Sequence, residues 1–187
     1  MATVEAIYDA TIQVLLKNGA DQLTTVNVAR RAGVSVGTLY QYFPHKQALL
    51  FAVLERHMLR AAKAVEDVCA ANHFEPLEVM VNEMVNRFIE AKLVDRDASV
   101  ALYKIAGDTG GNLIVGRTRS RYESAMNAML QTANLPASAD LNFMVHMIYL
   151  TMGGTLRGHL ESNASVRMTK KLREHLAKLI LAYCRAM

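Results

Sequence analysis

Apolar residues recur along most of this chain at intervals of three and four, which is the period of an amphipathic helix. In residues 3–18, for example, Ile7, Thr11 and Leu15 share one helical face, and the pattern stops at Asn18 and Gly19, a favourable helix end. No segment alternates between apolar and polar residues for long enough to predict a strand. We therefore expect an all-α fold.

Helix breakers divide the rest of the chain into further windows. The chain has three prolines, at positions 44, 76 and 136, and the glycine-rich segment 107–111 and the polar segment 161–165 form two more joints. Further helices are expected at 24–32, 35–43, 45–71, 76–94, 96–106, 112–134, 138–160 and 166–185. This makes about nine helices, which we divide into a small domain at 1–47 and a helical domain at 48–187.

Residues 25–42 have the spacing of a helix-turn-helix, in which two short helices cross at a steep angle. The crossing needs a small residue, which Ala29 provides, and the tight turn needs a positive φ, which Gly33 tolerates. The apolar residues that would fix the second helix on the first are Val28, Ala32, Val34 and Leu39. The composite pattern is specific, whereas an alanine followed four residues later by a glycine would mean little alone.

This segment resembles the DNA-binding domain of the tetracycline-repressor (TetR) family. The resemblance rests on the run from Leu23 to Val26, on the run from Ala32 to Lys46, and on Leu49 with Leu50. It covers the segment up to residue 55 or so, while the remainder is similar to the family in length and helix count only. It implies a transcriptional regulator, most often a repressor that a small molecule releases from its DNA site.

The resemblance also implies which residues meet DNA. Thr38, Tyr40, Gln41 and Tyr42 would lie on the recognition helix, with Ser35, Val36 and Gly37 at its start, and Thr25, Tyr42 and Lys46 would face phosphates. Chemistry agrees with this division, because Gln41 can pair with an adenine edge, Thr38 can meet a thymine methyl, and Lys46 suits phosphate oxygens. Tyr40 could equally be a packing residue, and we expect Phe43 to be core.

The charge distribution is more informative than the total. The formal net charge is +4 and the pI is near 9.1, which alone would not imply nucleic acid. No acidic residue falls between Asp21 and Glu55, whereas Arg30, Arg31 and Lys46 do. A local positive surface favours phosphate binding through counterion release, although a solvated basic face would have the same composition.

Nothing in the sequence directs the chain away from the cytoplasm. Cys69 and Cys184 are too few and too far apart for a disulfide framework, so both are expected to be reduced and buried. The first residues lack the basic-then-apolar run of a signal peptide. The most apolar stretch, 141–156, falls short of the roughly 20 residues that a membrane span needs. We expect a cytoplasmic protein without membrane contact.

The two last helical windows predict a homodimer. The window 138–160 is apolar nearly all round, so we expect one face to serve its own core and the other a second copy of the chain. The window 166–185 carries an apolar stripe from Met168 to Tyr183. Two-fold symmetry through these helices would match a palindromic operator in double-stranded DNA.

A small-molecule effector is expected among the helices between residues 76 and 160. The candidate lining residues are Met84, Phe88, Tyr103, Tyr122, Met126, Phe143, His146 and Met147. Arg87 and Arg121 are possible partners for an anionic group. Each of these residues could equally be an ordinary core or surface side chain, and the general expectation is an apolar molecule with one polar handle.

No pattern predicts catalysis, a metal site or a cofactor. Cys69 and His73 are an i, i+4 pair but lack a third ligand at a recognisable spacing. Two alternatives to a ligand-responsive regulator stay open. A helical small-molecule enzyme that contains a helix-turn-helix would need a polar catalytic cluster. A protein-interaction adaptor should lack the Thr, Tyr, Gln and Lys seen on the recognition face.

Overall fold

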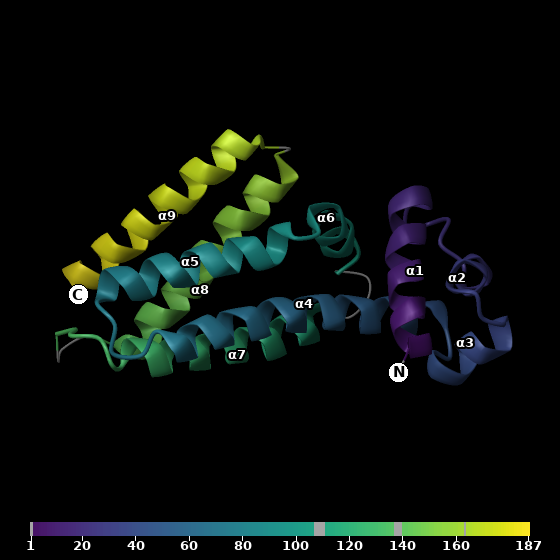
Figure 1. The fold of residues 1–187 in the computed structure, drawn as a ribbon, viewed down its shortest axis with the longest axis horizontal. Helices are drawn as coiled ribbons and strands as arrows, with labels where there is room; N and C mark the ends of the chain where they lie inside the picture. Colours follow the sequence, from purple (N-terminus) through teal and green to yellow (C-terminus); the bar gives the residue numbers. More distant parts are fainter. Residues whose placement is uncertain (1, 107–110, 137–139, 163) are drawn as a thin grey trace. The chain divides into compact units, whose positions relative to one another are not determined.

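The computed structural model describes residues 2–106, 111–136, 140–162 and 164–187, and these residues form nine α-helices and no strand (Figure 1). The helices are α1 (Ala2–Asn18), α2 (Thr25–Ala32), α3 (Val36–Tyr42), α4 (Lys46–Ala71), α5 (Leu77–Leu93), α6 (Arg96–Ile105), α7 (Gly111–Leu130), α8 (Leu141–Glu161) and α9 (Val166–Ala186). The prediction of an all-α fold is confirmed. Within the described ranges, no helix combines the length and the hydropathy that crossing a bilayer requires.

The predicted and observed helix ends differ most at α7. The sequence pattern continues to residue 134, but α7 ends at Leu130. The amides of Thr132 and Ala133 donate to carbonyls only three residues back, at 3.0 Å each, so the α-helical ladder gives way to tight turns. The Thr132 hydroxyl donates to the Met129 carbonyl and accepts the Phe74 amide at 2.8 Å, which ties this turn to the α4–α5 connection.

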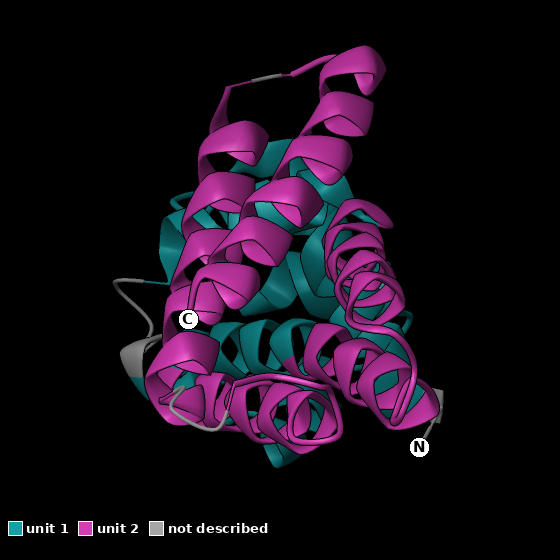
Figure 2. Cartoon of the chain, turned by 90° about the vertical axis from the view of Figure 1, so that its left-hand side faces the viewer, with its two compact units in different colours: residues 1–58, 95–115 teal, residues 59–94, 116–187 magenta. Residues whose placement is uncertain are grey.

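The chain forms two compact units, drawn in teal and magenta in Figure 2. The first unit comprises residues 1–58 and 95–115, and the second comprises residues 59–94 and 116–187. Helix α4 therefore contributes its first half to one unit and its second half to the other, while α6 belongs to the first unit. The predicted division at 47/48 does not coincide with these units, and as a division of function it stays a prediction.

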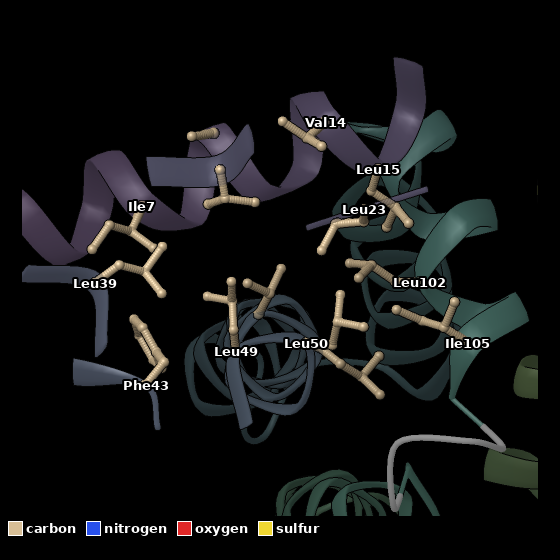
Figure 3. Packing of buried hydrophobic residues seen from close by; sticks show 14 of the residues in the cluster. Ile7, Val14, Leu15, Leu23, Leu39, Phe43, Leu49, Leu50, Leu102 and Ile105 are labelled. Carbon is tan, nitrogen blue, oxygen red and sulfur yellow. The ribbon is translucent and has the colours of Figure 1, made fainter. Parts of the chain in front are cut away.

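One hydrophobic cluster holds the first unit together (Figure 3). Ile7 of α1, Leu39 of α3 and Leu49 of α4 have no exposed surface at all. Leu102 and Ile105 of α6 join the same cluster, so a helix distant in sequence completes this core. Full burial of such a side chain contributes about 1.5–3 kcal/mol, and the cluster therefore dominates the stability of the unit.

Helices α5, α8 and α9 build much of the interior of the second unit. The buried residues of α5 are Met80, Val81, Met84, Val85, Phe88, Ile89 and Lys92. α9 packs beside α5, and two surface ion pairs join them: Arg173 to Glu90 at 3.2 Å, and Arg185 to Glu78. Exposed ion pairs of this kind contribute little to the free energy of folding. The burial of apolar side chains therefore holds α9 in place.

The place of α6 in the core of the first unit can be tested by Leu102→Ala. Leu102 is 1% exposed, so its truncation leaves a cavity and should lower the free energy of unfolding by about 2–5 kcal/mol. The control is Leu113→Ala, since Leu113 belongs to the same unit and is 71% exposed; it should change stability by less than about 0.5 kcal/mol. Urea denaturation measures both, and equal effects would contradict this packing.

Candidate nucleic-acid interface

The turn between α2 and α3 is fixed by backbone geometry that only a few residues permit. Thr24 caps α2 by accepting the Asn27 amide at 3.2 Å. At the other end, Gly33 has φ of 71°, in the left-handed region, and the Val34 amide donates to the Ala29 carbonyl at 3.0 Å. A residue with a Cβ would be strained at this φ, and the predicted role of Gly33 is confirmed.

The crossing of the two helices also follows the prediction. Val28, Ala29 and Leu39 are buried, with at most 1% of their surfaces exposed. Ala32 and Val34 are partly buried against the same cluster, and Phe43 is buried as expected. Residues 25–42 thus form a helix-turn-helix held rigidly on α1.

The start of α3 uses its polar side chains for capping. Ser35 Oγ accepts the Thr38 amide at 2.9 Å and lies 2.8 Å from Thr38 Oγ1. This capping orients the Thr38 hydroxyl, which is half-buried. Val36, predicted to lie with the DNA contacts, is half-buried and packs partly against the hydrophobic cluster.

The outward face of α3 presents Gly37, Tyr40, Gln41 and Tyr42, all of which are exposed. The Tyr40 hydroxyl lies 3.0 Å from Thr25 Oγ1, and Thr25 itself is only 9% exposed. The Thr25 hydroxyl therefore lies against Tyr40 and has little surface open to solvent. Among the described residues the Gln41 amide has no hydrogen-bond partner, so its donors and its acceptor are available to a base edge.

Lys46 begins α4, and one hydrogen bond fixes its side chain. Its Nζ donates to the Ala20 carbonyl at 2.7 Å, in the turn after α1. His45, which sequence analysis did not single out, caps α4 because its Nδ1 accepts the Ala48 amide at 3.1 Å. Histidine is not among the preferred capping residues, so the sequence offered no signal for it. The lysine ammonium keeps further donors for a phosphate.

The first unit concentrates positive charge on the helix-turn-helix side. Arg30 and Arg31 are exposed at the end of α2, and Arg31 Nε donates to Gln13 Oε1 at 2.6 Å. Arg56 is excluded from this surface by its ion pairs with Glu5 and Asp9. The combination of a rigid exposed helix, an available amide and unneutralised cations is typical of a surface that reads duplex DNA.

Two family profiles cover most of the chain. The profile described as "Bacterial regulatory proteins, tetR family" matches residues 7–53, over the helix-turn-helix. The profile described as "Tetracyclin repressor-like, C-terminal domain" matches residues 76–183, which is more than half of the chain. The chain belongs to the TetR family. The predicted resemblance is confirmed, and the second match extends it to the part that resembled the family only in helix count.

Relatives of this chain include transcriptional repressors and regulators. The chain is 35% identical over 102 residues to the HTH-type transcriptional repressor KstR of Mycobacterium tuberculosis, a match that covers 54% of the chain and 46% of KstR. The chain thus spans about half the length of this relative. FadR of Bacillus halodurans superposes with a TM-score of 0.74 at 19% identity, covering 95% of the chain and 97% of FadR.

A second solved structure, FadR of Bacillus subtilis in complex with stearoyl-CoA, has a TM-score of 0.73 at 17% identity. The superposition covers 94% of this chain and 96% of that FadR. At such low identities the two FadR structures establish a shared TetR fold and nothing finer.

The predicted effector residues are only partly brought together in this TetR-family chain. Met84, Phe88, Tyr122 and Met126 are all buried in the second unit, and Phe88 and Tyr122 pack edge to face with ring centroids 5.8 Å apart. Tyr149 extends this aromatic cluster, 5.7 Å from Tyr122. Tyr149 was not predicted from the sequence, because it is one of many similar residues in a helix that is apolar nearly all round.

Four other predicted effector contacts lie elsewhere. Phe143 and Met147 are 55% and 37% exposed, since they fall on the opposite side of α8 from its buried residues. His146 is half-buried, with Nδ1 2.7 Å from Glu123 Oε1. Tyr103 belongs to the first unit, not to the unit that holds the aromatic cluster.

Arg121, considered as a partner for an anionic ligand, is already engaged. Its Nε and Nη2 donate to the two carboxylate oxygens of Glu66, at 2.6 and 2.5 Å. The bond from Arg121 is the main reason that the pKa of Glu66 falls below its ordinary value of 4.5. The pair joins α4 to α7 within the second unit, which makes it a structural clamp.

This clamp should make stability depend on pH in a defined direction. A carboxyl whose pKa is lowered by folding contributes stability above its unfolded pKa, and that contribution is lost as the pH falls through the lowered folded value. Glu66→Gln should therefore reduce the free energy of unfolding at pH 7 by up to about 1 kcal/mol, given its partial exposure. The difference in the free energy of unfolding between the wild type and Glu66→Gln should shrink below about pH 4.

The matched control is Glu161→Gln, since Glu161 pairs with Arg157 four residues away and both side chains are more than half exposed. Its effect should be smaller at every pH. Urea unfolding across pH 3–8 measures both variants. A Glu66→Gln deficit that grew in acid would contradict this account of the clamp.

Proposed function

We propose that this chain is a homodimeric transcriptional repressor that binds a palindromic operator and is released from it by a small-molecule effector. The observation that carries the proposal is the outward face of α3, where the exposed Gln41 amide and Tyr42 stand on a helix fixed by the core. Recognition helices read sequence from such a face in the major groove. Binding to DNA would place the protein in the cytoplasm of a bacterial cell.

The polar residues of the interface divide into two roles. Gln41 is suited to a bidentate contact with adenine, and the ordered Thr38 side chain to a thymine methyl or base edge. Lys46, Tyr42 and the linked pair of Thr25 and Tyr40 are suited to phosphates, which set register without reading sequence.

The effector is proposed to occupy the second unit near its aromatic cluster. Met84, Met126, Phe88 and Tyr122 provide a soft apolar environment there, because thioether side chains repack easily around an inserted group. Bacillus subtilis FadR has been solved with stearoyl-CoA, and a mostly apolar ligand with one polar end is the class we propose for this chain. The position of Arg121 in the clamp with Glu66 argues against that arginine as the anion partner.

Helix α6 is proposed to pass the effector signal to the DNA-binding surface. The chain enters α6 directly from the second unit, at residues 94 and 95, while Leu102 and Ile105 are packed in the core that supports α3. The long helix α4, which contributes to both units, provides a second route. A coupling of about 1–3 kcal/mol between the two sites would suffice for regulation.

Dimerisation is proposed through α8 and α9. Phe143, Met147 and Leu150 recur on one exposed stripe of α8 and are 55%, 37% and 48% exposed. Leu179 of α9 is also 54% exposed. A continuous apolar stripe is costly in water, and a two-fold partner would cover it while setting two recognition helices about 34–36 Å apart.

The DNA-binding proposal is tested by selecting sites from a randomised duplex pool with the full chain. We expect enrichment of a palindrome of about 15–20 base pairs, as two half-sites one helical turn apart require. Thr38→Ala should relax the preference at single positions. Lys46→Ala should weaken all sequences evenly and reduce the slope of log K against log salt by about 1.8, which is about 0.9 for each subunit of the dimer. Failure of the wild-type chain to enrich any site would overturn the proposal.

Because Lys46 also holds the Ala20 carbonyl, its variant needs a stability check. Thermal unfolding of Lys46→Ala shows whether the turn after α1 is retained. Gln47→Ala removes an exposed neighbouring side chain without a charge and is the matched control; it should leave the salt slope unchanged. If both variants reduced the slope of log K against log salt, the change would reflect a disturbed structure at the start of α4 and not a lost phosphate contact.

The dimer proposal is tested by Met147→Glu, which places a charge within the exposed stripe of α8. We expect a monomer in analytical ultracentrifugation, because a buried unpaired carboxylate opposes association. Val79→Glu is the matched control, since Val79 on α5 is 38% exposed, nearly the same as Met147. A monomeric wild-type chain, or dissociation by both variants alike, would contradict an interface on α8.

A further inference from the structure

A polar cleft of about 550 Å³ lies between α1 and α2, within the first unit. Three cations line it: Lys17 from α1, and Arg30 and Arg31 from α2. Three amide side chains, those of Gln13, Asn18 and Asn27, complete its polar lining. One apolar residue, Val14, is also present, and no carboxylate is.

The cleft holds most of the positive charge of residues 1–58. Residues 1–58 contain five Lys and Arg residues, and three of them line this cleft. The other two are Lys46, which donates to the Ala20 carbonyl, and Arg56, which pairs with Glu5 and Asp9. The charge of the cleft is therefore the largest local concentration of cations in this segment.

The cleft is also preorganised. Arg31 Nε donates to Gln13 Oε1 at 2.6 Å, which fixes the arginine across the gap between the two helices. No ion pair within the described residues neutralises Lys17 or Arg30. Holding donors in place before a ligand arrives lowers the entropy lost on binding.

The lining selects for oxyanions. Lysine and arginine side chains only donate hydrogen bonds, and the amides add further donors, whereas a phosphate group offers several acceptor oxygens. The cleft has no aromatic side chain on which a base or another ring could stack. The cleft could therefore contact little of the base of a nucleotide or of an apolar effector. It could contact most of the oxygens of a backbone phosphate.

We propose that this cleft binds backbone phosphates of duplex DNA, adding a second phosphate contact to the one formed by Lys46. The inference rests on the proposed DNA-binding function and deepens it. α2 begins at Thr25 beside Tyr40 and ends with Arg30 and Arg31 in the cleft, and its eight residues span about 12 Å. Phosphates of one strand recur about every 3.4 Å along the duplex axis, so one strand can meet both ends of α2.

A simpler role for these cations is stabilisation of helix ends. Lys17 lies in the last turn of α1, and Arg30 and Arg31 lie in the last turn of α2, where the helix dipole favours positive charge. Lys104 likewise lies in the last turn of α6, in the same unit, but it does not line the cleft. Lys104→Gln is therefore a matched control for loss of one charge at a helix end.

The experiment measures binding of the full chain to a mixed-sequence 30-base-pair duplex, and to the selected operator, at several salt concentrations. Because the proposed dimer has two clefts, Lys17→Gln and Arg30→Gln should each reduce the slope of log K against log salt by about 1.8, and together by about 3.6. The double variant should bind both duplexes about a hundredfold to a thousandfold more weakly near 0.15 M salt. Preference for the operator over the mixed sequence should not change.

Lys104→Gln should retain the wild-type slope. If Lys17→Gln and Arg30→Gln also retain it, the cleft does not touch DNA and the inference is overturned, even though the wild-type chain binds. Absence of any duplex binding by the wild-type chain would instead overturn the proposed function, and this inference with it. Thermal unfolding of each variant separates lost contacts from lost folding.

A free phosphate could present the same chemistry as the DNA backbone. The wild-type chain is therefore titrated with inorganic phosphate alone, and the arginine side-chain N–H signals are followed by NMR. Weak phosphate binding that a duplex displaces would support the inference. Phosphate binding that is lost in the double variant, while the salt slope for DNA stays that of the wild type, would identify a small-anion site and overturn it.

Discussion

A helix of seven residues is not stable in water by itself, because it forms too few internal hydrogen bonds to offset the cost of nucleation. Helix α3 is of this kind, and it exists because Leu39 is locked into the cluster shared by α1, α2 and α4. The positive φ of Gly33 sets the direction in which α3 leaves the turn. The side chains on the outward face of α3 take their positions from this packing, so the core of the first unit also fixes the surface that we propose reads DNA.

The same core explains how a distant site could influence DNA binding. Leu102 and Ile105 bring α6 into the cluster, and the chain arrives at α6 directly from the second unit. Protein interiors are close-packed, so a displaced core side chain forces its neighbours to move. The side chains of half-buried His57 and buried Ser99 lie 2.9 Å apart and add a polar contact between α4 and α6. A regulatory movement therefore has a physical route through α6 as well as along α4.

Some polar side chains around α3 form hydrogen bonds within the protein, and at least one, that of Gln41, has no such bond among the described residues. Thr25 bonds to Tyr40, Ser35 to Thr38, and these contacts hold the side chains in one conformation before DNA arrives. Gln41 has an available amide, and its position is fixed by the helix alone. Preorganisation of this kind favours affinity because less side-chain freedom is lost on binding.

The sequence alone determined the helix-turn-helix and the all-α fold, because turn geometry and helical periodicity are local: Gly33 had to adopt a positive φ, and apolar residues had to recur every three to four positions. Side-chain pairing between distant segments is not local. Only the tertiary structure decided that α6 belongs to the first unit, that Arg121 is bound by Glu66, and that Arg30 meets the end of α1 in one basic cleft. Those outcomes depend on which helix faces pack together, and period and spacing do not encode that choice.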